Sequence, residues 1–399
     1  MSTKGFRSSG HLPSLVAALV HFDVSFMVWV LLGALGVYVA DDLGLGPAQK
    51  GLMVAIPPLG GAFFRLVLGA VADRFGMKRT GVLSMALVLL PLMWGWQFAG
   101  TYVEILGIGM LLGIAGASFA VALPLVSRWY PPEHQGLALG IAGAGNSGTI
   151  VAALVAPRLA EHVGWHGVFG LAAIPVCAAW LFFVVVAKEP PSTGSSQPEG
   201  GLLGLLGEAD ARWLCAFYLT TFGGFVGLTG YLPIYFHDRF DLSKVSAAGF
   251  AALCAAAGSV LRPIGGGVAD RLGGTRVLSL VLMFVAGAGT VLAVLPPLSV
   301  TVVVMCATLG ALGVGNGAVF QIVPQRYPTR MGQITGLVGA AGGVGGFLLP
   351  FGLGALAELT GGFAVGFVLF ALAAGSAAGL VRRRQRVWRS AAWSMEVAL

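Results

Sequence analysis

Two arginines, Arg65 and Arg262, lie within long apolar stretches of the sequence. Each stands 8 residues before an aspartate, Asp73 or Asp270, which at a helical rise of about 1.5 Å per residue is roughly 12 Å into a membrane. A guanidinium cannot release its proton, so at that depth each side chain should face a polar cavity and a partner. A planar guanidinium binds a planar oxyanion through short, charge-assisted bidentate hydrogen bonds. The two arginines therefore indicate a binding site for a small anion.

The alternative is that each arginine forms an internal ion pair with a carboxylate. The acidic residues argue against this, because all but one fall in or beside the polar segments between the apolar stretches: Asp41, Asp42, Asp73, Glu104, Glu133, Glu161, Glu189, Glu199, Glu208, Asp210, Asp238, Asp241, Asp270, Glu358 and Glu396. Only Asp23 lies well inside an apolar stretch. Two buried positive charges against at most one buried carboxylate leave a net positive cavity, which favours an anion and repels cations.

The elements that carry these arginines must be membrane helices. The 399-residue chain is 57% hydrophobic and only 10% charged, with a mean hydropathy of +0.88, so it lacks the polar surface of a soluble protein. Stretches of about 20 apolar residues, enough to cross about 30 Å of hydrocarbon as a helix, are found at 13–40, 48–71, 79–99, 102–127, 134–159, 164–187, 210–237, 244–268, 275–295, 299–324, 330–356 and 361–381. We expect an all-α membrane protein with twelve transmembrane helices.

The positive charges predict how these helices are oriented. Of the 23 lysines and arginines, two are the buried arginines, and only Lys50, Arg158, Arg239 and Lys244 fall on the side away from the termini. The other 17 share one side, which the positive-inside rule assigns to the cytoplasm. We expect a multi-pass protein of the cytoplasmic membrane with both termini inside. The basic segment 382–389 is then a topology anchor near anionic lipid, and no nucleic-acid partner is expected.

An internal repeat at an offset of 197 residues divides the chain in two. Arg65 recurs as Arg262, the loop residues Asp73, Arg74 and Gly76 recur as Asp270, Arg271 and Gly273, Tyr130 and Pro131 recur as Tyr327 and Pro328, and Gly145 and Gly148 recur as Gly342 and Gly345. Separate features at one spacing indicate a duplicated architecture. We expect a six-helix half at 1–190, a cytoplasmic Pro/Gly/Ser-rich linker at 191–208 and a second six-helix half at 209–399 with a basic tail.

Two parallel six-helix halves with a central linker resemble the major facilitator superfamily, and GAVADRFGMKR (69–79) and GGVADRLGGTR (266–276) look like its conserved loop. That fold places substrate near mid-membrane between two pseudo-symmetric halves. The resemblance implies gating by charge pairing that holds the cytoplasmic side closed in one state, through Asp73, Arg74, Arg79, Asp270 and Arg271. The alternative for each of these residues is a solvated topology loop.

Further motifs resemble one branch, the nitrate/nitrite porter family: SFMVWVLLGALG (25–36), GGAFFRLVLGAVADRFG (60–76), GIAGAGNSG (140–148), GSVLRPIGGGVADRLGG (258–274) and GLVGAAGGVGG (336–346). The resemblance implies a flat aromatic slot formed by Phe119, Tyr218 and Phe222, and an amide contact from Asn146. It also implies roles for the glycines of the two signatures, Gly143, Gly145 and Gly148, and Gly342, Gly343, Gly345 and Gly346. The second signature lacks an asparagine, so we expect it to serve mainly backbone packing.

The coupling ion is the open question at this stage. His21 and Asp23 lie in the first apolar stretch, and two residues apart they point about 200° from each other on a helix. One of them should line the cavity; His21 aligns with Tyr218 at the 197-residue offset and is favoured, whereas Asp23 could instead accept a hydrogen bond from a neighbouring helix or pair with an arginine. A titrating residue would allow nitrate/proton symport, which we slightly prefer over nitrate/nitrite antiport.

The sequence thus predicts a secondary active transporter that works by alternating access, with nitrate or nitrite, membrane lipid and possible protons as its partners. We expect a functional monomer that is not an enzyme, because no catalytic, metal or cofactor motif accompanies the helices. A carrier of another small organic or inorganic anion is the nearest alternative. A drug or sugar exporter of the same fold is a rival, but it would call for buried carboxylates or many hydroxyl and amide groups rather than paired arginines.

Overall fold

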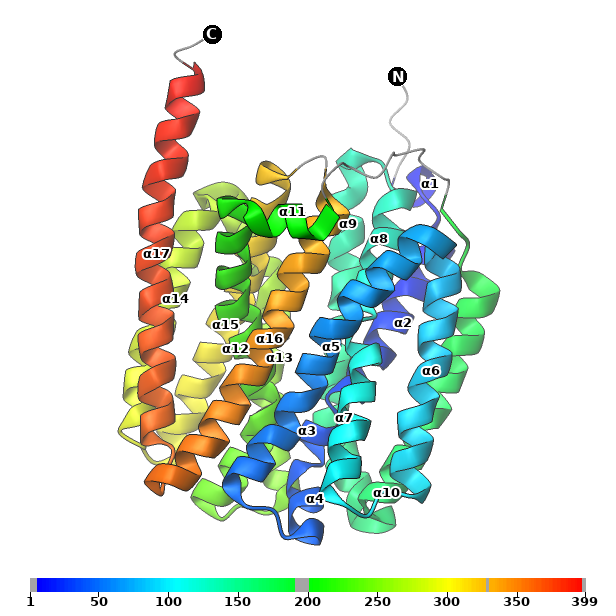
Figure 1. Cartoon of the computed structure of the whole chain (residues 1–399), viewed down its shortest axis with the longest axis vertical. Helices are drawn as coiled ribbons and strands as arrows, with labels where there is room; N and C mark the ends of the chain where they lie inside the picture. Colours follow the sequence, from blue (N-terminus) through cyan, green and yellow to red (C-terminus); the bar gives the residue numbers. More distant parts are fainter. Residues whose placement is uncertain (1–5, 191–200, 328–329, 397–399) are drawn as a thin grey trace.

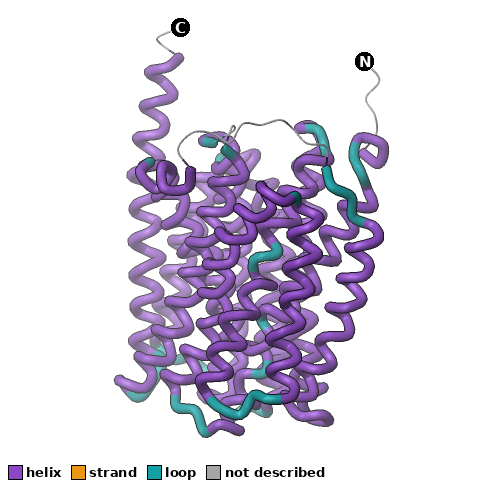
Figure 2. The backbone as a smooth tube through the Cα atoms, turned by 45° about the vertical axis from the view of Figure 1, so that its right-hand side comes forward, coloured by secondary structure: helices purple, strands orange, loops and turns teal. Residues whose placement is uncertain are grey.

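The computed structural model describes residues 6–190, 201–327 and 330–396. The first ten residues of the predicted linker, 191–200, and Pro328 of the predicted repeat lie outside the described residues. Every regular element in the described part of the chain is helical, and the helices form one bundle (Figure 2). We call the end of the bundle where α2 begins and α17 ends the termini face, and the other end the opposite face (Figure 1).

The helices follow one another along the chain in the predicted order. The first half contains α1 (Phe6–Ser9), α2 (Leu12–Trp29), α3 (Leu31–Ala34), α4 (Gly36–Leu43), α5 (Pro47–Phe75), α6 (Met77–Gln97), α7 (Tyr102–Gly116), α8 (Phe119–Trp129), α9 (Pro132–Gly143), the 3₁₀ turn η1 (Ala144–Ser147) and α10 (Gly148–Val186). The second contains α11 (Gly201–Gly207), α12 (Ala209–Phe240), α13 (Lys244–Leu272), α14 (Gly274–Ala293), α15 (Leu298–Arg326), α16 (Met331–Thr360) and α17 (Ala364–Glu396). Short α11 occupies the end of the predicted linker.

Twelve crossings result from eleven long apolar helical stretches in the described residues. The longest, Ala138–Val186, has 49 residues, which is about twice what one crossing needs. It reverses at Gly164, whose φ of 69° and ψ of 166° are outside the helical region and accessible chiefly to glycine. The two predicted stretches at 134–159 and 164–187 are therefore separate crossings, and the twelve-helix prediction is confirmed.

Several crossings differ from the sequence prediction in where their helices begin and end, and the last and the first differ most. The last helix, α17, runs to Glu396 rather than ending near 381, and it projects beyond the bundle (Figure 1). The apolar stretch ends at the run of arginines that begins at 382, and the predicted crossing therefore ends there. The helix itself continues through these residues because arginine is a good helix former. The first crossing is broken at Val30 and Leu35 into α2, α3 and α4. At this break Gly33 faces the backbone of Gly230 in α12 at a separation that leaves no room for a Cβ.

The two halves meet along α5 and α16, which cross the centre of the bundle side by side (Figure 1). Small residues permit this approach. A Cβ on Gly51 of α5 would be 2.9 Å from the Cα of Gly354 in α16, and a Cβ on Gly343 of α16 would be 2.8 Å from the carbonyl oxygen of Pro58. The line where the halves meet therefore depends on glycine at both contacts, and Arg65 makes a further contact along α5, with Gly339 of α16.

Candidate functional site

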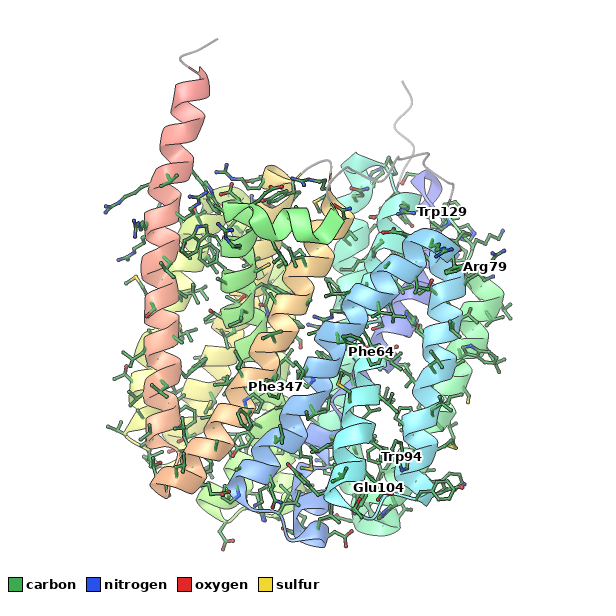
Figure 3. All side chains as sticks on the ribbon, in the orientation of Figure 1. Phe64, Arg79, Trp94, Glu104, Trp129 and Phe347 are labelled. Carbon is green, nitrogen blue, oxygen red and sulfur yellow. The ribbon has the colours of Figure 1, made fainter. Side chains whose placement is uncertain are left out.

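Arg65 lies on α5 at the contact between the halves. Its side chain is only 2% exposed. Nε donates to the carbonyl oxygen of Gly116 in the first half (3.1 Å), and Nη1 donates to that of Gly339 on α16 in the second half (2.5 Å). Figure 3 shows its neighbour Phe64 between Arg79 at the termini face and Glu104 at the opposite face, so this charge lies deep within the bundle.

Aromatic rings surround the Arg65 guanidinium. Its carbon lies 5.4 Å from the ring centroid of Trp29, 5.6 Å from Phe119 and 5.2 Å from Phe222. The negative faces of such rings attract a cation and repay part of the cost of removing it from water. These rings hold the guanidinium in place without neutralising its charge.

Arg262 approaches the same ring from the second half. It lies on α13, is half-buried, and has its guanidinium carbon 6.0 Å from the centroid of Phe222. Phe222 thus has one arginine of each half beside it. Tyr218, one turn earlier on α12, stacks on Phe222 with centroids 4.8 Å apart and an interplanar angle of 8°. The structure brings together both arginines and the three rings that the sequence singled out.

Neither arginine has a carboxylate partner in the described part of the chain. Six ion pairs occur there, and none includes Arg65 or Arg262. The two groups and Tyr218 are close enough to interact electrostatically. The site therefore carries two positive charges from opposite halves and can bind an anion that bridges them.

Several hydrogen-bonding groups around this site have no protein partner among the described residues. They are Nη2 of Arg65, Nη1 of Arg262, the hydroxyl of Tyr218 and both amide atoms of Asn146. The Tyr218 hydroxyl faces the Arg262 guanidinium. Buried groups of this kind are usually paired, so they are suited to receive a ligand rich in acceptor oxygens.

The first glycine-rich signature forms the turn η1 between α9 and α10. Such a 3₁₀ segment within a crossing often marks a hinge. A Cβ on Gly145 would be 2.6 Å from the Phe22 ring, and one on Gly148 would be 1.9 Å from the carbonyl oxygen of Asp23, whereas Gly143 has open space beside it. The backbone of η1 thus lies directly on α2, and buried Asn146 is carried by that turn.

The second signature packs against two helices at once. Gly342 lies under the rings of Tyr218 and Phe222, and Gly345 lies against the backbone of Leu219 on α12. Gly343 and Gly346 both face Pro58 of α5. These are contacts of close helix packing, and they hold the rings of Tyr218 and Phe222 against the backbone of α16.

The two ionisable residues of α2 have different surroundings. His21 is buried against the ring of Phe183 on α10, with centroids 4.9 Å apart, and Phe183 also packs against Gly81 of α6. Its contacts therefore lie inside the first half and do not support the preference for His21 as the cavity residue. Asp23 is half-buried and accepts a hydrogen bond of 2.6 Å from Ser147 of η1, which is the neighbouring-helix bond that the sequence left open.

The residues expected to gate the cytoplasmic side lie at the termini face. Asp73 forms an ion pair with Arg128 at 3.2 Å within the first half, and Arg74 lies over the ring of Phe75. Arg79, which Figure 3 shows at this face, Asp270 and Arg271 form none of the ion pairs found in residues 6–190, 201–327 and 330–396. Within those ranges, no lysine or arginine pairs with a carboxylate across the halves at this face.

The opposite face carries a feature that the sequence reading missed. Lys50 of α5 pairs with Asp238 of α12 at 2.9 Å, and Lys244 of α13 pairs with Asp41 of α4 at 2.6 Å. Both pairs cross between the halves, and we call them the crossed ion pairs. Asp41 and Asp238 are 197 residues apart, so the repeat offset was the signal that could have identified them. Glu358 adds a third contact across the halves, accepting from the backbone nitrogen of Ala48.

Between the arginine site and these pairs the bundle is nearly filled. The space lined by Trp29, Val30, Gly33, Val54, Pro57, Pro58, Val226 and Gly230 amounts to only ≈ 10 Å³, about enough for one water molecule. The Trp29 indole donates to the carbonyl oxygen of Pro57 at 2.8 Å beside it. The site is therefore closed toward the opposite face.

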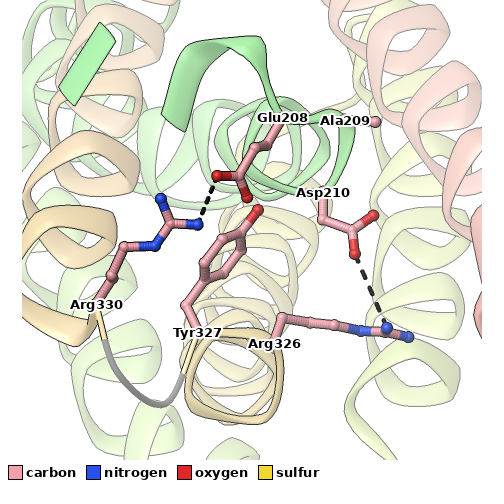
Figure 4. A pocket seen from close by; sticks show the side chains of 6 residues that line it. All are labelled: Glu208, Ala209, Asp210, Arg326, Tyr327 and Arg330. Atoms are coloured by element: carbon pink, nitrogen blue, oxygen red, sulfur yellow. Dashed lines mark hydrogen bonds and ion pairs between the residues drawn. The ribbon is translucent and has the colours of Figure 1, made fainter. Parts of the chain in front are cut away.

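A larger cavity of ≈ 350 Å³ lies at the termini face, within the second half (Figure 4). Arg330 pairs with Glu208 there at 2.5 Å, and Arg326 pairs with Asp210 at 3.8 Å. The Arg330 hydrogen bond lowers the pKa of Glu208, so the carboxylate stays ionised and the pair intact near neutral pH. Because these arginines are already neutralised, this cavity is a weaker candidate for anion binding than the site at Arg65 and Arg262.

The crossed ion pairs yield a first prediction. In a variant with the native cysteines replaced, Lys50→Asp should place two carboxylates together and open the opposite face. A reporter cysteine at Val54, which is 4% exposed, should then react several-fold faster with a membrane-impermeant thiol reagent. An ion pair near the surface contributes only about 0.2–1 kcal/mol to the closed state, so the expected increase in labelling rate is no more than several-fold.

The charge swap is the control for this prediction. The double variant Lys50→Asp/Asp238→Lys restores an attractive pair and should return the labelling rate of Val54→Cys to its starting value. Equal labelling in all three proteins would show that the crossed ion pairs do not hold this face closed.

Comparison with known proteins agrees with this architecture. The sequence profile of the Major Facilitator Superfamily matches residues 17–350. The structure resembles the xylose transporter XylE from E. coli in a partially occluded inward-open conformation, with a TM-score of 0.76 and 14% identity over 94% of this chain and 98% of that one. A bacterial homolog of the human lysosomal transporter Spinster gives a TM-score of 0.72 at 18% identity over 96% and 98%. A twelve-helix bundle with a charged site between its halves, carrying this profile, is a transporter of the major facilitator superfamily.

Relatives in sequence narrow the family. The chain is 35% identical over 355 residues to the probable nitrate/nitrite transporter NarK2 of Mycobacterium tuberculosis, with 87% of this chain and 89% of that protein covered. It is 32% identical over 343 residues to the nitrite extrusion protein of Bacillus subtilis, with 86% and 87% covered. The chain belongs to the nitrate/nitrite porter family, as its motifs indicated.

Proposed function

We propose that this protein transports nitrate and nitrite across the cytoplasmic membrane by alternating access, with the anion held between Arg65 and Arg262. The observation that carries the proposal is that one guanidinium of each half lies beside Phe222 without a carboxylate partner among the described residues. A planar anion in this position would neutralise both charges and link the halves. The names of the relatives from M. tuberculosis and B. subtilis support this choice of anion.

The closed opposite face sets the direction of the access path. The excess of positive charge on the side of the termini assigns the termini face to the cytoplasm. In this conformation the crossed ion pairs and the filled space around Trp29 block the path to the outside. We infer that the alternate state breaks these pairs and closes the cytoplasmic side through the loops of Asp73 and Asp270, with the two halves rocking around the anion.

The charge balance of the site favours exchange as the coupling mechanism. Moving the halves with two uncompensated buried guanidinium groups is costly, because burial penalises an unpaired charge. A bound anion reduces this cost in both directions, so nitrate entering and nitrite leaving would each support one half of the cycle. From the sequence, proton symport depends on titration of either His21 or Asp23, and the contacts of His21 lie within the first half. Asp23, hydrogen-bonded to Ser147, remains the residue through which a proton could act.

Uptake by proteoliposomes tests both the substrate and the coupling. Vesicles loaded with nitrite should take up labelled nitrate, whereas vesicles without internal nitrite should take up little, even under an inwardly directed proton gradient. Uptake into nitrite-free vesicles that depends on the gradient and is lost in Asp23→Asn would establish symport instead. No nitrate uptake under either condition, with transport of another anion in a panel, would overturn the proposed substrate.

A further inference from the structure

Asn316 of α15 is a second buried asparagine near the site. It belongs to none of the sequence motifs and is not one of the site residues named so far. Its side chain is 1% exposed, and neither Oδ1 nor Nδ2 has a hydrogen-bond partner in the described part of the chain. A buried carboxamide with all its hydrogen bonds unmade is unfavourable and calls for an explanation. Groups of this kind are satisfied by an ordered water or by a ligand, and the position of Asn316 favours a ligand.

The neighbours of Asn316 place it at the level of Arg262. The next residue, Gly317, lies so close to α13 that its Cβ would be 2.5 Å from the carbonyl oxygen of Arg262. One turn earlier, Leu312 packs against Gly224 of α12. Because residues four apart share a helix face, Asn316 points between α12, which carries Phe222, and α13, which carries Arg262.

One turn later on the same face, Phe320 reaches the anion site. Its ring lies 5.0 Å from that of Tyr218, edge to face, and 5.8 Å from that of Phe119. Asn316 and Phe320 therefore form one strip of α15 directed at the site between the halves. The amide lies on the strip nearer to Arg262, and the ring lies nearer to Phe119.

The internal repeat relates the position of Asn316 to a residue of the site in the first half. Asn316 is separated by 197 residues from Phe119, and Asn146 is separated by 197 residues from Gly343. Each half therefore provides one arginine and one buried asparagine whose amide has no hydrogen-bond partner among the described residues, but at positions that the repeat does not relate: Asn146 precedes α10 in the first half, and Asn316 lies on α15 in the second. The two halves thus bring the same pair of functional groups, a guanidinium and a carboxamide, to the region of the site.

We propose that Asn316 contacts the transported anion, donating from Nδ2 to an oxygen held by Arg262, and that it sets the preference for nitrate over nitrite. This inference rests on the proposed function. Two arginines and two amides offer donors on every side of a trigonal anion with three oxygens. Nitrite has one oxygen fewer, so it loses less when one of the four groups is removed.

The test compares nitrate and nitrite binding to purified wild-type protein and to Asn316→Leu, which keeps the volume but removes the polar atoms. We expect nitrate affinity to fall about tenfold, equivalent to about 1.4 kcal/mol, and nitrite affinity to fall much less. We also expect Asn316→Leu to unfold at the same or a higher temperature, because an unpaired buried amide has been replaced by an apolar group.

Gln321→Leu provides a matched control on the same helix. Its Oε1 is also without a partner among the described residues, but it lies against Gly274 at the start of α14. Gln321→Leu should leave the ratio of nitrate to nitrite affinity unchanged. An unchanged ratio in Asn316→Leu, with nitrate bound normally by the wild type, would overturn the role of Asn316 and leave the proposed function standing. A wild-type protein that binds neither anion would overturn the proposed function itself.

Discussion

Arg65→Lys should nearly abolish nitrate transport although it keeps the positive charge. The three N–H donors of lysine radiate from one nitrogen, so they cannot occupy the separate positions of Nε and Nη1 beside Gly116 and Gly339 and also direct an N–H at the anion. Hydrogen bonds to charged groups contribute about 1.5–3 kcal/mol each, so loss of one or two of them predicts nitrate affinity weaker by about 100-fold. Arg262→Lys should act in the same direction. Nitrate binding to purified protein and uptake by proteoliposomes measure the two effects.

Arg128→Lys is the matched control for this prediction. Arg128 is exposed, pairs with Asp73 at the termini face and lies in the same half as Arg65. A lysine there can keep the ion pair, so binding and uptake should stay near wild type. Arg65→Lys protein that is folded, as judged by gel filtration, and that transports nitrate normally would show that the guanidinium does not bind the anion.

Gly345→Ala should cost stability on a scale unusual for the addition of one methyl group. The new Cβ would be 2.1 Å from the carbonyl oxygen of Leu219 and 3.0 Å from the Cα of Gly223, and both are backbone atoms of α12 that cannot rotate away. Separation of α12 from α16 would also displace the rings of Tyr218 and Phe222. We expect a loss of about 3 kcal/mol, at the upper end for overpacking, together with loss of uptake. Thermal unfolding of the detergent-solubilised protein measures the first effect.

Gly336→Ala on the same helix should increase stability rather than decrease it. Nothing lies within 4 Å of the Cβ position of Gly336, so alanine there should stabilise α16 by about 0.5–1 kcal/mol through its better helix propensity. Gly148→Ala, at the position equivalent to Gly345 by the repeat offset, should instead behave like Gly345→Ala, because its Cβ would meet the carbonyl oxygen of Asp23. A Gly345→Ala protein that melts at the wild-type temperature would contradict the close approach of α12 and α16.

The sequence was most informative where a residue was costly in its surroundings. Arg65 and Arg262 stand out because a charged side chain in an apolar stretch is costly unless it has a function. The twelve crossings stand out because polar residues are excluded from the hydrocarbon of a membrane, which makes each crossing a long apolar stretch. The rings of Phe119, Tyr218 and Phe222, by contrast, look like ordinary packing in the sequence, and only the family resemblance singled them out. The structure places Phe119 and Phe222 beside the arginines, and it stacks Tyr218 on Phe222.

Orientation and long-range pairing could not be predicted in this way. A helical period places His21 and Asp23 on different faces but does not say which face meets Phe183 and which meets Ser147. The crossed ion pairs join residues 188 positions apart or more; the repeat offset relates Asp41 to Asp238, but neither aspartate carries a local signal of the lysine that pairs with it. The break at Val30 likewise depends on the approach of α12, which no feature of the first crossing encodes.

The exposure of the crossed ion pairs makes the balance between conformations sensitive to salt. The side chains of Lys244 and Asp41 are 31% and 46% exposed, so ions in the solution at that face screen their attraction. The screening length falls from about 30 Å at 0.01 M to about 8 Å at physiological ionic strength. Arg65 is enclosed by rings and helices and feels little of this screening. Ionic strength at the opposite face therefore acts on the closure of the carrier while leaving the electrostatics of its anion site almost unchanged.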